Sequence, residues 1–322
     1  MKHFVVVLFL SAVFARSEEL RLESSAEAMG STYSLVLYGE DRVRLEAASE
    51  DAFEEVRRLD RVFSNYLPSS EWSEVNRYAA GRPVKVSDEL FRLLSACVDY
   101  SRQSEGAFDI SVGPLMRVWG FYKGSGRLPW RAEILGALSK VGYRNILLDT
   151  GAKTVRFARE GVELDPAGIG KGYAVDRMVD ILRKDGVRSA LVSASGSSIY
   201  ALGTPPDETG WKVGIRDPNN EAKTVTEVTL KNESMSTSGN YEKFFLAEGK
   251  LYSHIMDPRT GYPAAGTLSA SVIAPLTLDS EAWAKPFYVN GRDWAAKHKP
   301  IGFRVYLCTG EAGTEQSCAW LQ

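Results

Sequence analysis

A glycine-rich turn around a single lysine is the feature that most constrains how this chain folds. Residues 163–172 read Glu-Leu-Asp-Pro-Ala-Gly-Ile-Gly-Lys-Gly, and a helical pattern begins directly after Lys171. Glycine lets a ligand approach the backbone closely, and a helix N-terminus offers amide donors and a favourable field to an anion. The spacing matches neither the dinucleotide fingerprint nor the Walker P-loop. The turn therefore indicates a strand-to-helix connection, which either only links two elements or also binds a phosphate group through Lys171.

The residue periodicity on both sides of this turn is typical of an α/β or α+β protein. Apolar residues recur at helical spacing over 41–63, after Ser87 as a helix N-cap, over 135–141, and from Lys171 to Gly186. Strand-like runs occur at 33–38, 145–149, 154–157 and 187–194, and several more lie between 211 and 275. The chain contains no Pro- or Ser-rich linker and no internal repeat. We therefore expect one compact domain over residues 16–322, with a central mixed sheet flanked by helices.

Residues 1–15 have the features of a secretory signal peptide. Lys2 and His3 precede an apolar run that ends at Phe14, which is too short to span a bilayer, and Val-Phe-Ala at 13–15 suits cleavage. No cysteine follows the run, so we expect no lipid anchor on a mature N-terminus. The sequence predicts a periplasmic or secreted protein that is not a lipoprotein and does not insert stably into a membrane.

Charge, histidines and cysteines exclude several classes of function. Removing residues 1–15 takes away one lysine and no acid, so the formal charge changes from −2 to −3. A near-neutral chain with dispersed basic residues is not expected to bind nucleic acid. Only His254 and His298 remain, which argues against a Cys/His zinc site. Cys97 lies on an apolar helical face, whereas Cys308 and Cys318 flank a hairpin-like segment and should form a disulfide in an oxidising compartment.

Six short segments, in this order, carry a resemblance to a known family. Each one alone is compatible with ordinary turn chemistry. They are Met29-Gly-Ser, Phe63-Ser-Asn-Tyr66, Ala107-Phe-Asp109, Asp165-Pro-Ala-Gly-Ile-Gly-Lys-Gly-Tyr-Ala-Val-Asp176, Thr237-Ser-Gly-Asn-Tyr241 and His254-Ile-Met-Asp-Pro-Arg-Thr-Gly261. Together, over about residues 28–307, they resemble the FAD:protein FMN transferase (ApbE-type) family.

The resemblance implies a fold, a reaction and a set of site residues. The fold would be a single ApbE-type (T-fold-like) domain with a central cleft. The reaction would move FMN from FAD onto a threonine or serine hydroxyl of an exported flavoprotein, release AMP and use Mg²⁺. Gly168, through its carbonyl, and Glu281 would hold the metal, and His254 and Lys171 would act in catalysis. The FAD site implied is Met29, Tyr66, Ala107, Phe108, Asp109, Asp165, Lys171, Ser238, Ile255 and Asp257.

The residue types suit these roles, and each also has a plainer interpretation. Tyr66 offers a ring for stacking on adenine or flavin, or simply covers the core. Asp109 and Asp165 would accept hydrogen bonds from the ligand, or would only cap turns. Lys171 would neutralise charge on the leaving AMP, or would be a solvated lysine at a helix start. His254 would deprotonate the acceptor hydroxyl or orient the phosphoryl group, or would only satisfy a loop hydrogen bond.

The metal segment departs from the family pattern. The family reads Ala-Asp-Ala followed, two or three residues later, by Thr, whereas residues 279–287 here read Asp-Ser-Glu-Ala-Trp-Ala-Lys-Pro-Phe. Glu281 replaces the acid and Lys285 replaces the threonine. Lysine has no acceptor atom for a metal, and an ammonium about 4 Å from a dication would be repelled by roughly 8 kcal/mol at a dielectric near 20. Pro286 should delay or kink the helix, and Asp279 is a possible substitute ligand.

Three functions remain open on the sequence alone. The first, which we expect, is a working flavin transferase that keeps a weakened metal at Glu281 or Asp279. The second is a non-catalytic FAD-binding relative in which Lys285 replaces the cation. The third is an FAD hydrolase that gives FMN and AMP because water replaces the acceptor hydroxyl.

Overall fold

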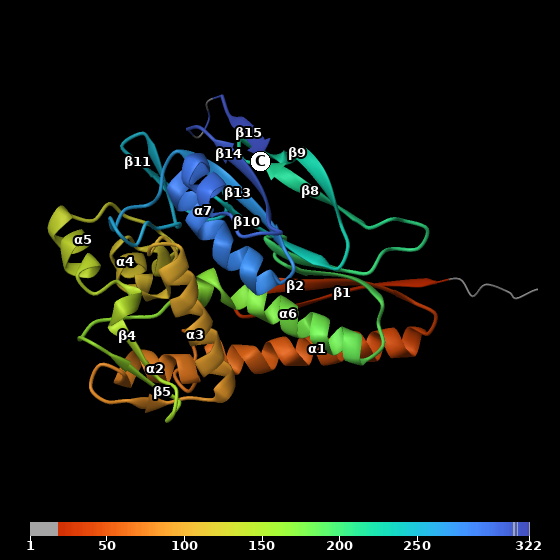
Figure 1. Ribbon diagram of the computed structural model, residues 1–322, viewed down its shortest axis with the longest axis horizontal. Helices are drawn as coiled ribbons and strands as arrows, with labels where there is room; N and C mark the ends of the chain where they lie inside the picture. Colours follow the sequence, from red (N-terminus) through yellow and green to blue (C-terminus); the bar gives the residue numbers. More distant parts are fainter. Residues whose placement is uncertain (1–18, 312, 314, 322) are drawn as a thin grey trace, which may run out of the picture.

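The main sheet has eight strands and is antiparallel throughout (Figure 1). The computed structural model describes residues 19–311, 313 and 315–321, so the expected signal peptide lies outside the described residues. Within this part the strand order is β1–β2–β6–β7–β10–β13–β14–β15, and each adjacent pair is antiparallel. The bounds are β1 Leu20–Ala28, β2 Ser31–Gly39, β6 Ser189–Ala194, β7 Ser198–Leu202, β10 Glu233–Gly239, β13 Thr267–Ala274, β14 Arg304–Thr309 and β15 Ser317–Trp320.

The expected fold class is confirmed, with one correction to the sheet. We expected a mixed sheet, but three of its neighbouring pairs, β1–β2, β6–β7 and β14–β15, are hairpins, and a hairpin can only be antiparallel. The longer connections also return antiparallel, as where β2 pairs with β6. Strand direction in such long-range pairs depends on tertiary packing, which periodicity does not encode.

Helices cover one face of the main sheet and a hairpin covers the other. The helices α1 (Arg42–Phe63), α6 (Gly170–Lys184) and α7 (Thr277–His298) lie side by side in Figure 1. Leu35 and Leu37 of β2 face α1 and α6 in one core cluster, whereas Val36 between them faces β8 (Trp211–Asp217) and β9 (Asn220–Leu230). This alternation is the period of two expected for a strand buried on both faces.

A second region, at the left in Figure 1, is built from short elements. It contains α2 (Glu71–Tyr78), α3 (Asp88–Gln103), α4 (Gly113–Val118) and α5 (Arg131–Leu138), with the strands β3 (Val84–Lys85), β4 (Ile146–Asp149), β5 (Thr154–Phe157), β11 (Phe244–Ala247) and β12 (Lys250–Ser253). The N-cap expected at Ser87 is confirmed, because its Oγ accepts from Leu90 N at 3.2 Å. Helix α5 begins before the expected residue 135, because Glu133 accepts from the Trp130 amide and stabilises an earlier start.

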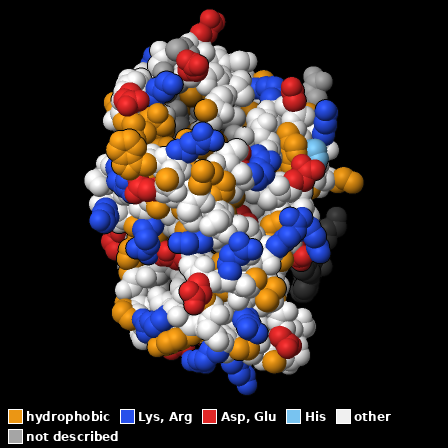
Figure 2. Space-filling model, turned by 90° about the vertical axis from the view of Figure 1, so that its left-hand side faces the viewer, with side chains coloured by type: hydrophobic (Ala, Val, Ile, Leu, Met, Phe, Trp, Pro, Cys, Tyr) orange, Lys and Arg blue, Asp and Glu red, His pale blue; other side chains and the backbone are white. Residues whose placement is uncertain are grey.

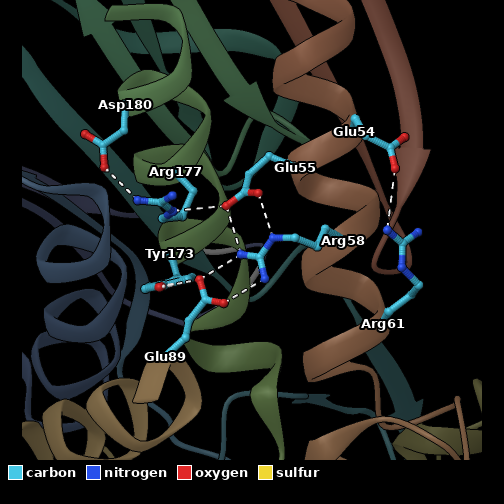
Figure 3. Close-up of polar contacts among 8 residues, drawn as sticks. All are labelled: Glu54, Glu55, Arg58, Arg61, Glu89, Tyr173, Arg177 and Asp180. Carbon is cyan, nitrogen blue, oxygen red and sulfur yellow. Dashed lines mark hydrogen bonds and ion pairs between the residues drawn. The ribbon is translucent and has the colours of Figure 1, made fainter. Parts of the chain in front are cut away.

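A polar network ties three helices together near the start of α6 (Figure 3). Arg58 of α1 donates to Glu55 on its own helix and, at 2.8 Å, to both carboxylate oxygens of Glu89 on α3. From α6, Tyr173 donates to Glu89 at 2.9 Å and Arg177 donates to Glu55 at 3.1 Å. Single exposed ion pairs contribute little, but a shared network of half-buried groups holds helices in register. The N-terminus of α6, which carries Lys171, is therefore fixed against α1 and α3.

Helix α7 corrects the expectation for Pro286. The helix starts at Thr277 and continues through Pro286, and its non-helical residue is Gly291 at φ 74°. Proline has a helical φ, so the chain passes with one backbone hydrogen bond fewer. The break falls at Gly291 because positive φ has little cost for glycine.

The expected disulfide is confirmed. Cys308 of β14 and Cys318 of β15 face each other across the hairpin, with their sulfurs 2.06 Å apart. Cys97 is buried on α3, as its position on an apolar face predicted. No helix in the described ranges has the length and apolar character needed to cross a membrane.

Candidate active site

Segments far apart in the sequence meet at a cavity of about 230 Å³ at one end of the main sheet. A smaller hollow of about 90 Å³ adjoins it and shares Asp165, His254, Ile255 and Lys285 with it. The two hollows bring together most of the residues that the sequence singled out. These are Met29, Tyr66, Ala107, Phe108, Asp109, Asp165, Gly168, Lys171, Ser238, His254, Ile255 and Glu281.

Backbone hydrogen bonds between turns hold this end of the sheet together. The amide of Ser195 in the β6–β7 turn donates to Thr32 O of β2, and the amide of Thr237 in β10 donates to Ser197 O, both at 2.8 Å. Asp176 of α6 accepts from the amides that open α7, at 2.7 and 2.8 Å. A carboxylate at a helix N-terminus is a favourable cap. The lining segments are therefore fixed relative to one another before any ligand binds.

The glycine turn joins a short 3₁₀ segment (Pro166–Gly168) to α6. Asp165 Oδ1 caps that segment by accepting from Ala167 N at 2.7 Å, and its Oδ2 accepts from Tyr122 OH at 3.0 Å. At Gly172 an added Cβ would lie 2.5 Å from Thr277 O, so only glycine lets α6 approach α7 this closely. Part of the turn's glycine content therefore serves helix packing, while Lys171 on the first turn of α6 lines the cavity.

Lys171 is held by a neighbouring turn. Its Nζ donates to Ser197 Oγ at 2.5 Å, and Ser197 itself is buried in the β6–β7 turn. A lysine ammonium has three donors. Within the part of the chain that the structure describes, two donors of Lys171 therefore remain for a ligand in the cavity.

His254 is oriented as a proton acceptor. Its Nδ1 lies 3.1 Å from Lys243 O, and because a carbonyl only accepts, Nδ1 carries the proton. Among the described residues Nε2 has no hydrogen-bond partner. Burial, together with the positive charges of Lys243, Lys171 and Lys285, lowers the pKa of His254 to about 4, against the hydrogen bond to the Lys243 carbonyl, which raises it. The ring is therefore neutral at pH 7, and Nε2 is free to take a proton.

Asp109 and Asp165 both form turn-capping hydrogen bonds, which were the alternative to a role in ligand binding. Asp109 Oδ1 accepts from Ser111 N at 2.8 Å, and its Oδ2 accepts from Tyr143 N at 2.5 Å. Burial raises the pKa of Asp109 and of Asp165, against the hydrogen bonds that each accepts. Both residues nevertheless line the hollows, so a capping role and a place in the ligand wall coincide.

Two expected site residues lie at or beyond the edge. Tyr66 is 77% exposed at the rim, between the cavity and a neighbouring hollow of about 590 Å³ that Arg77 and Arg117 also line. Asp257 does not line the described cavities, because its carboxylate pairs with Arg259 Nε at 2.9 Å within its own turn.

The residues at the expected metal position do not fit Mg²⁺. Glu281 is 2% exposed, and its Oε2 accepts from Gly172 N at 2.5 Å while its Oε1 lies 3.7 Å from Lys285 Nζ. Burial lowers the pKa of Lys285 to about 8, against the attraction of Glu281. Asp279, considered as a substitute ligand, accepts from Tyr100 OH at 2.5 Å. Mg²⁺ requires near-octahedral oxygen ligands, which this set does not supply.

Sequence reasoning missed several residues of the lining. Tyr122 bonds to Asp165, and Lys243 supplies the carbonyl that orients His254. Tyr122 follows two other aromatic residues, Trp119 and Phe121, and this local clustering was its only signal. Lys243 is exposed and acts through its backbone, which no residue pattern marks.

Comparison with known proteins agrees with this geometry. The model of the ApbE family matches residues 29–302. The chain is 33% identical to an FAD:protein FMN transferase of Klebsiella pneumoniae (strain 342), with 80% of this chain and 79% of the relative aligned. A relative of the same name from Treponema pallidum is 32% identical, over 76% and 72% of the two chains.

Solved structures show the same fold. An ApbE protein of Thermotoga maritima superposes with a TM-score of 0.83 at 29% identity, covering 91% of this chain and 97% of the other. The flavinyl transferase ApbE of Pseudomonas stutzeri also gives 0.83, at 28% identity, with 94% and 95% covered.

Proposed function

Because this chain belongs to the ApbE family, we propose that it transfers FMN from FAD to a threonine or serine hydroxyl of an acceptor flavoprotein and releases AMP. One observation carries the proposal beyond family membership. The neutral His254, with Nε2 free, lines the same cavity as the Lys171 ammonium. A base and a cation around one cavity are what phosphoryl transfer to a hydroxyl requires.

FAD binds with its diphosphate at the glycine turn. Lys171, on the first turn of α6, offers donors and positive charge to the phosphate oxygens. Tyr66 at the rim presents a ring on which the adenine or the isoalloxazine stacks. The lone pairs that Asp165 keeps after its two internal bonds accept from ligand hydroxyl or amino groups.

In the reaction the acceptor oxygen attacks the phosphorus of the FMN half. A bond forms between the acceptor Oγ and that phosphorus, and the bond from phosphorus to the bridging oxygen breaks. AMP leaves with the bonding electron pair, and His254 Nε2 takes the proton of the hydroxyl. Lys171 stabilises the charge that grows on the leaving phosphate. The reaction passes through no metal ion, because the residues at that position do not fit one.

The acceptor approaches from outside the domain. The hollow beside Tyr66, with Arg77 and Arg117 at its walls, lies next to the cavity and offers a polar entrance. Figure 2 shows the face on which α2, α4 and α5 lie, with Lys and Arg spread among acidic and hydrophobic side chains. We propose that enzyme and acceptor meet outside the cytoplasm, because residues 1–15 read as a signal peptide.

Transfer is tested with purified protein lacking residues 1–15, FAD and a flavinylatable acceptor domain. We expect in-gel flavin fluorescence and an FMN mass increase on the acceptor. His254→Gln should slow transfer by about 100-fold or more, the contribution typical of a general base. His298→Gln is the matched control, because His298 stacks on Trp294 at 4.1 Å in α7 and does not line the described cavities. FAD binding with AMP release but no transfer would instead identify a hydrolase, and FAD binding without either product a carrier.

A further inference from the structure

We propose that the ammonium of Lys285 takes the place of a divalent metal ion, so that FAD binds and is turned over without one. The inference rests on the proposed function. It follows from the disagreement between the metal site that the family resemblance implies and the side chains that occupy this position.

Lys285 is close to both residues expected to hold the metal. Its Nζ donates to Glu281 O at 2.9 Å and is 3.7 Å from Glu281 Oε1. Its Cε is 3.7 Å from the place of a Cβ built on Gly168, so the side chain also passes close to Gly168. A cation bound at Glu281 would therefore be repelled by this ammonium.

Glu281 is already satisfied by protein groups. One carboxylate oxygen accepts from Gly172 N at the start of α6, and the other faces Lys285. A buried carboxylate needs hydrogen bonds and a counter-charge, and this one has both. Removing Lys285 to admit a metal would break that arrangement.

The neighbouring carboxylates are already hydrogen-bonded within the protein. The described residues also contain no group of three or more His, Cys, Asp or Glu able to hold a metal ion. Asp279 bonds to Tyr100 OH, and Asp176 accepts from the amides of Thr277 and Leu278. The carboxylates of Asp279 and Asp176 are therefore already used in structural contacts.

Lysine side chains in the cavity offer donors to a diphosphate. Lys171 and Lys285 line it together with Lys243 and with four acidic residues, Asp60, Asp165, Glu242 and Glu281. During transfer both ammonium groups stay protonated and hold the phosphate oxygens, while the bond changes and the proton acceptor are those given above. A lysine carries one positive charge where a divalent metal ion carries two, so it stabilises the leaving phosphate less strongly, but turnover does not depend on a metal ion.

Metal dependence is measured directly on the purified protein. FAD affinity by calorimetry and the transfer rate are compared in EDTA and in Mg²⁺, and Mn²⁺ binding is followed by electron paramagnetic resonance. We expect the FAD affinity in EDTA to agree with that in Mg²⁺ within twofold, and likewise the transfer rate. We also expect no stoichiometric Mn²⁺ site at micromolar concentration. FAD binding or transfer that requires Mg²⁺ overturns this inference and leaves the proposed function standing. Absence of FAD binding in both buffers overturns both.

Variants at residue 285 isolate the role of the ammonium. Lys285→Thr should weaken FAD binding in EDTA by at least tenfold and regain it with Mg²⁺, whereas Lys285→Arg should stay within threefold of wild type. Lys250→Thr, which removes an exposed lysine on β12, is the matched control and should change nothing. Circular dichroism verifies that each variant is folded. A folded Lys285→Thr protein that binds FAD in EDTA as wild type does would overturn the inference.

Discussion

Gly172 is the position in the glycine turn where a methyl group has least room. A Cβ there would lie 2.5 Å from Thr277 O and 2.8 Å from Glu281 Oε2. Alanine in place of a helical glycine normally gains up to about 1 kcal/mol, but overpacking costs about 1–3 kcal/mol. Losing the hydrogen bond from Gly172 N to the buried carboxylate costs about 1.5–3 kcal/mol more. We therefore expect Gly172→Ala to lower the free energy of unfolding by about 3 kcal/mol.

The assay is thermal unfolding followed by circular dichroism. For a chain of this size, about 3 kcal/mol corresponds to a fall in Tm of roughly 5 °C. Gly168→Ala is the matched control, because its Cβ would meet Lys285 Cε and Phe108 Cε2 at 3.7 Å, an ordinary contact distance. We expect the Tm of Gly168→Ala to equal that of the wild type. An unchanged Tm for Gly172→Ala, or an equal fall for Gly168→Ala, would refute the packing argument.

Three further predictions follow from single contacts. Replacing Cys308 and Cys318 by serine opens a loop with a sequence separation of 10 and should cost roughly 3 kcal/mol, measured by denaturant unfolding; no loss would contradict it. The acid limb of the transfer rate should lie near pH 4, where His254 protonates, and a midpoint near pH 6.5 would show that its ring is not desolvated. Arg58→Met should cost about 1 kcal/mol at pH 7, the upper end of the range for a partly exposed ion pair. Arg58 lowers the pKa of Glu55, so this stabilisation is complete above the usual pKa of 4.5 and is lost as the pH falls through the lowered value. The free energies of unfolding of variant and wild type should therefore converge near pH 3, and a constant difference between them would count against the network.

Local chemistry made much of the fold predictable. The helix over 41–63, the Ser87 cap and the strands at 145–149 and 154–157 agree closely with α1, α3, β4 and β5. The cysteine pair was readable because its members flank a short hairpin. Sheet direction was not readable, since β2 and β6 lie far apart in the sequence and pair only through tertiary packing.

The candidate site was predictable where residue types are unusual and unpredictable where backbone groups act. The lysine in the glycine turn and the single histidine within a motif both line the cavity. The Lys243 carbonyl that sets the tautomer of His254 left no trace in the sequence. Pro286 was expected to delay or kink the helix, but α7 continues through it and its non-helical residue is Gly291, where positive φ has little cost.

A crystal structure of the protein with FAD, grown in EDTA, tests the central claim most directly. We predict the diphosphate within hydrogen-bond distance of both Lys171 Nζ and Lys285 Nζ, with His254 Nε2 facing the phosphorus of the FMN half. FAD bound elsewhere, or a cavity that stays empty at saturating FAD, would contradict the account.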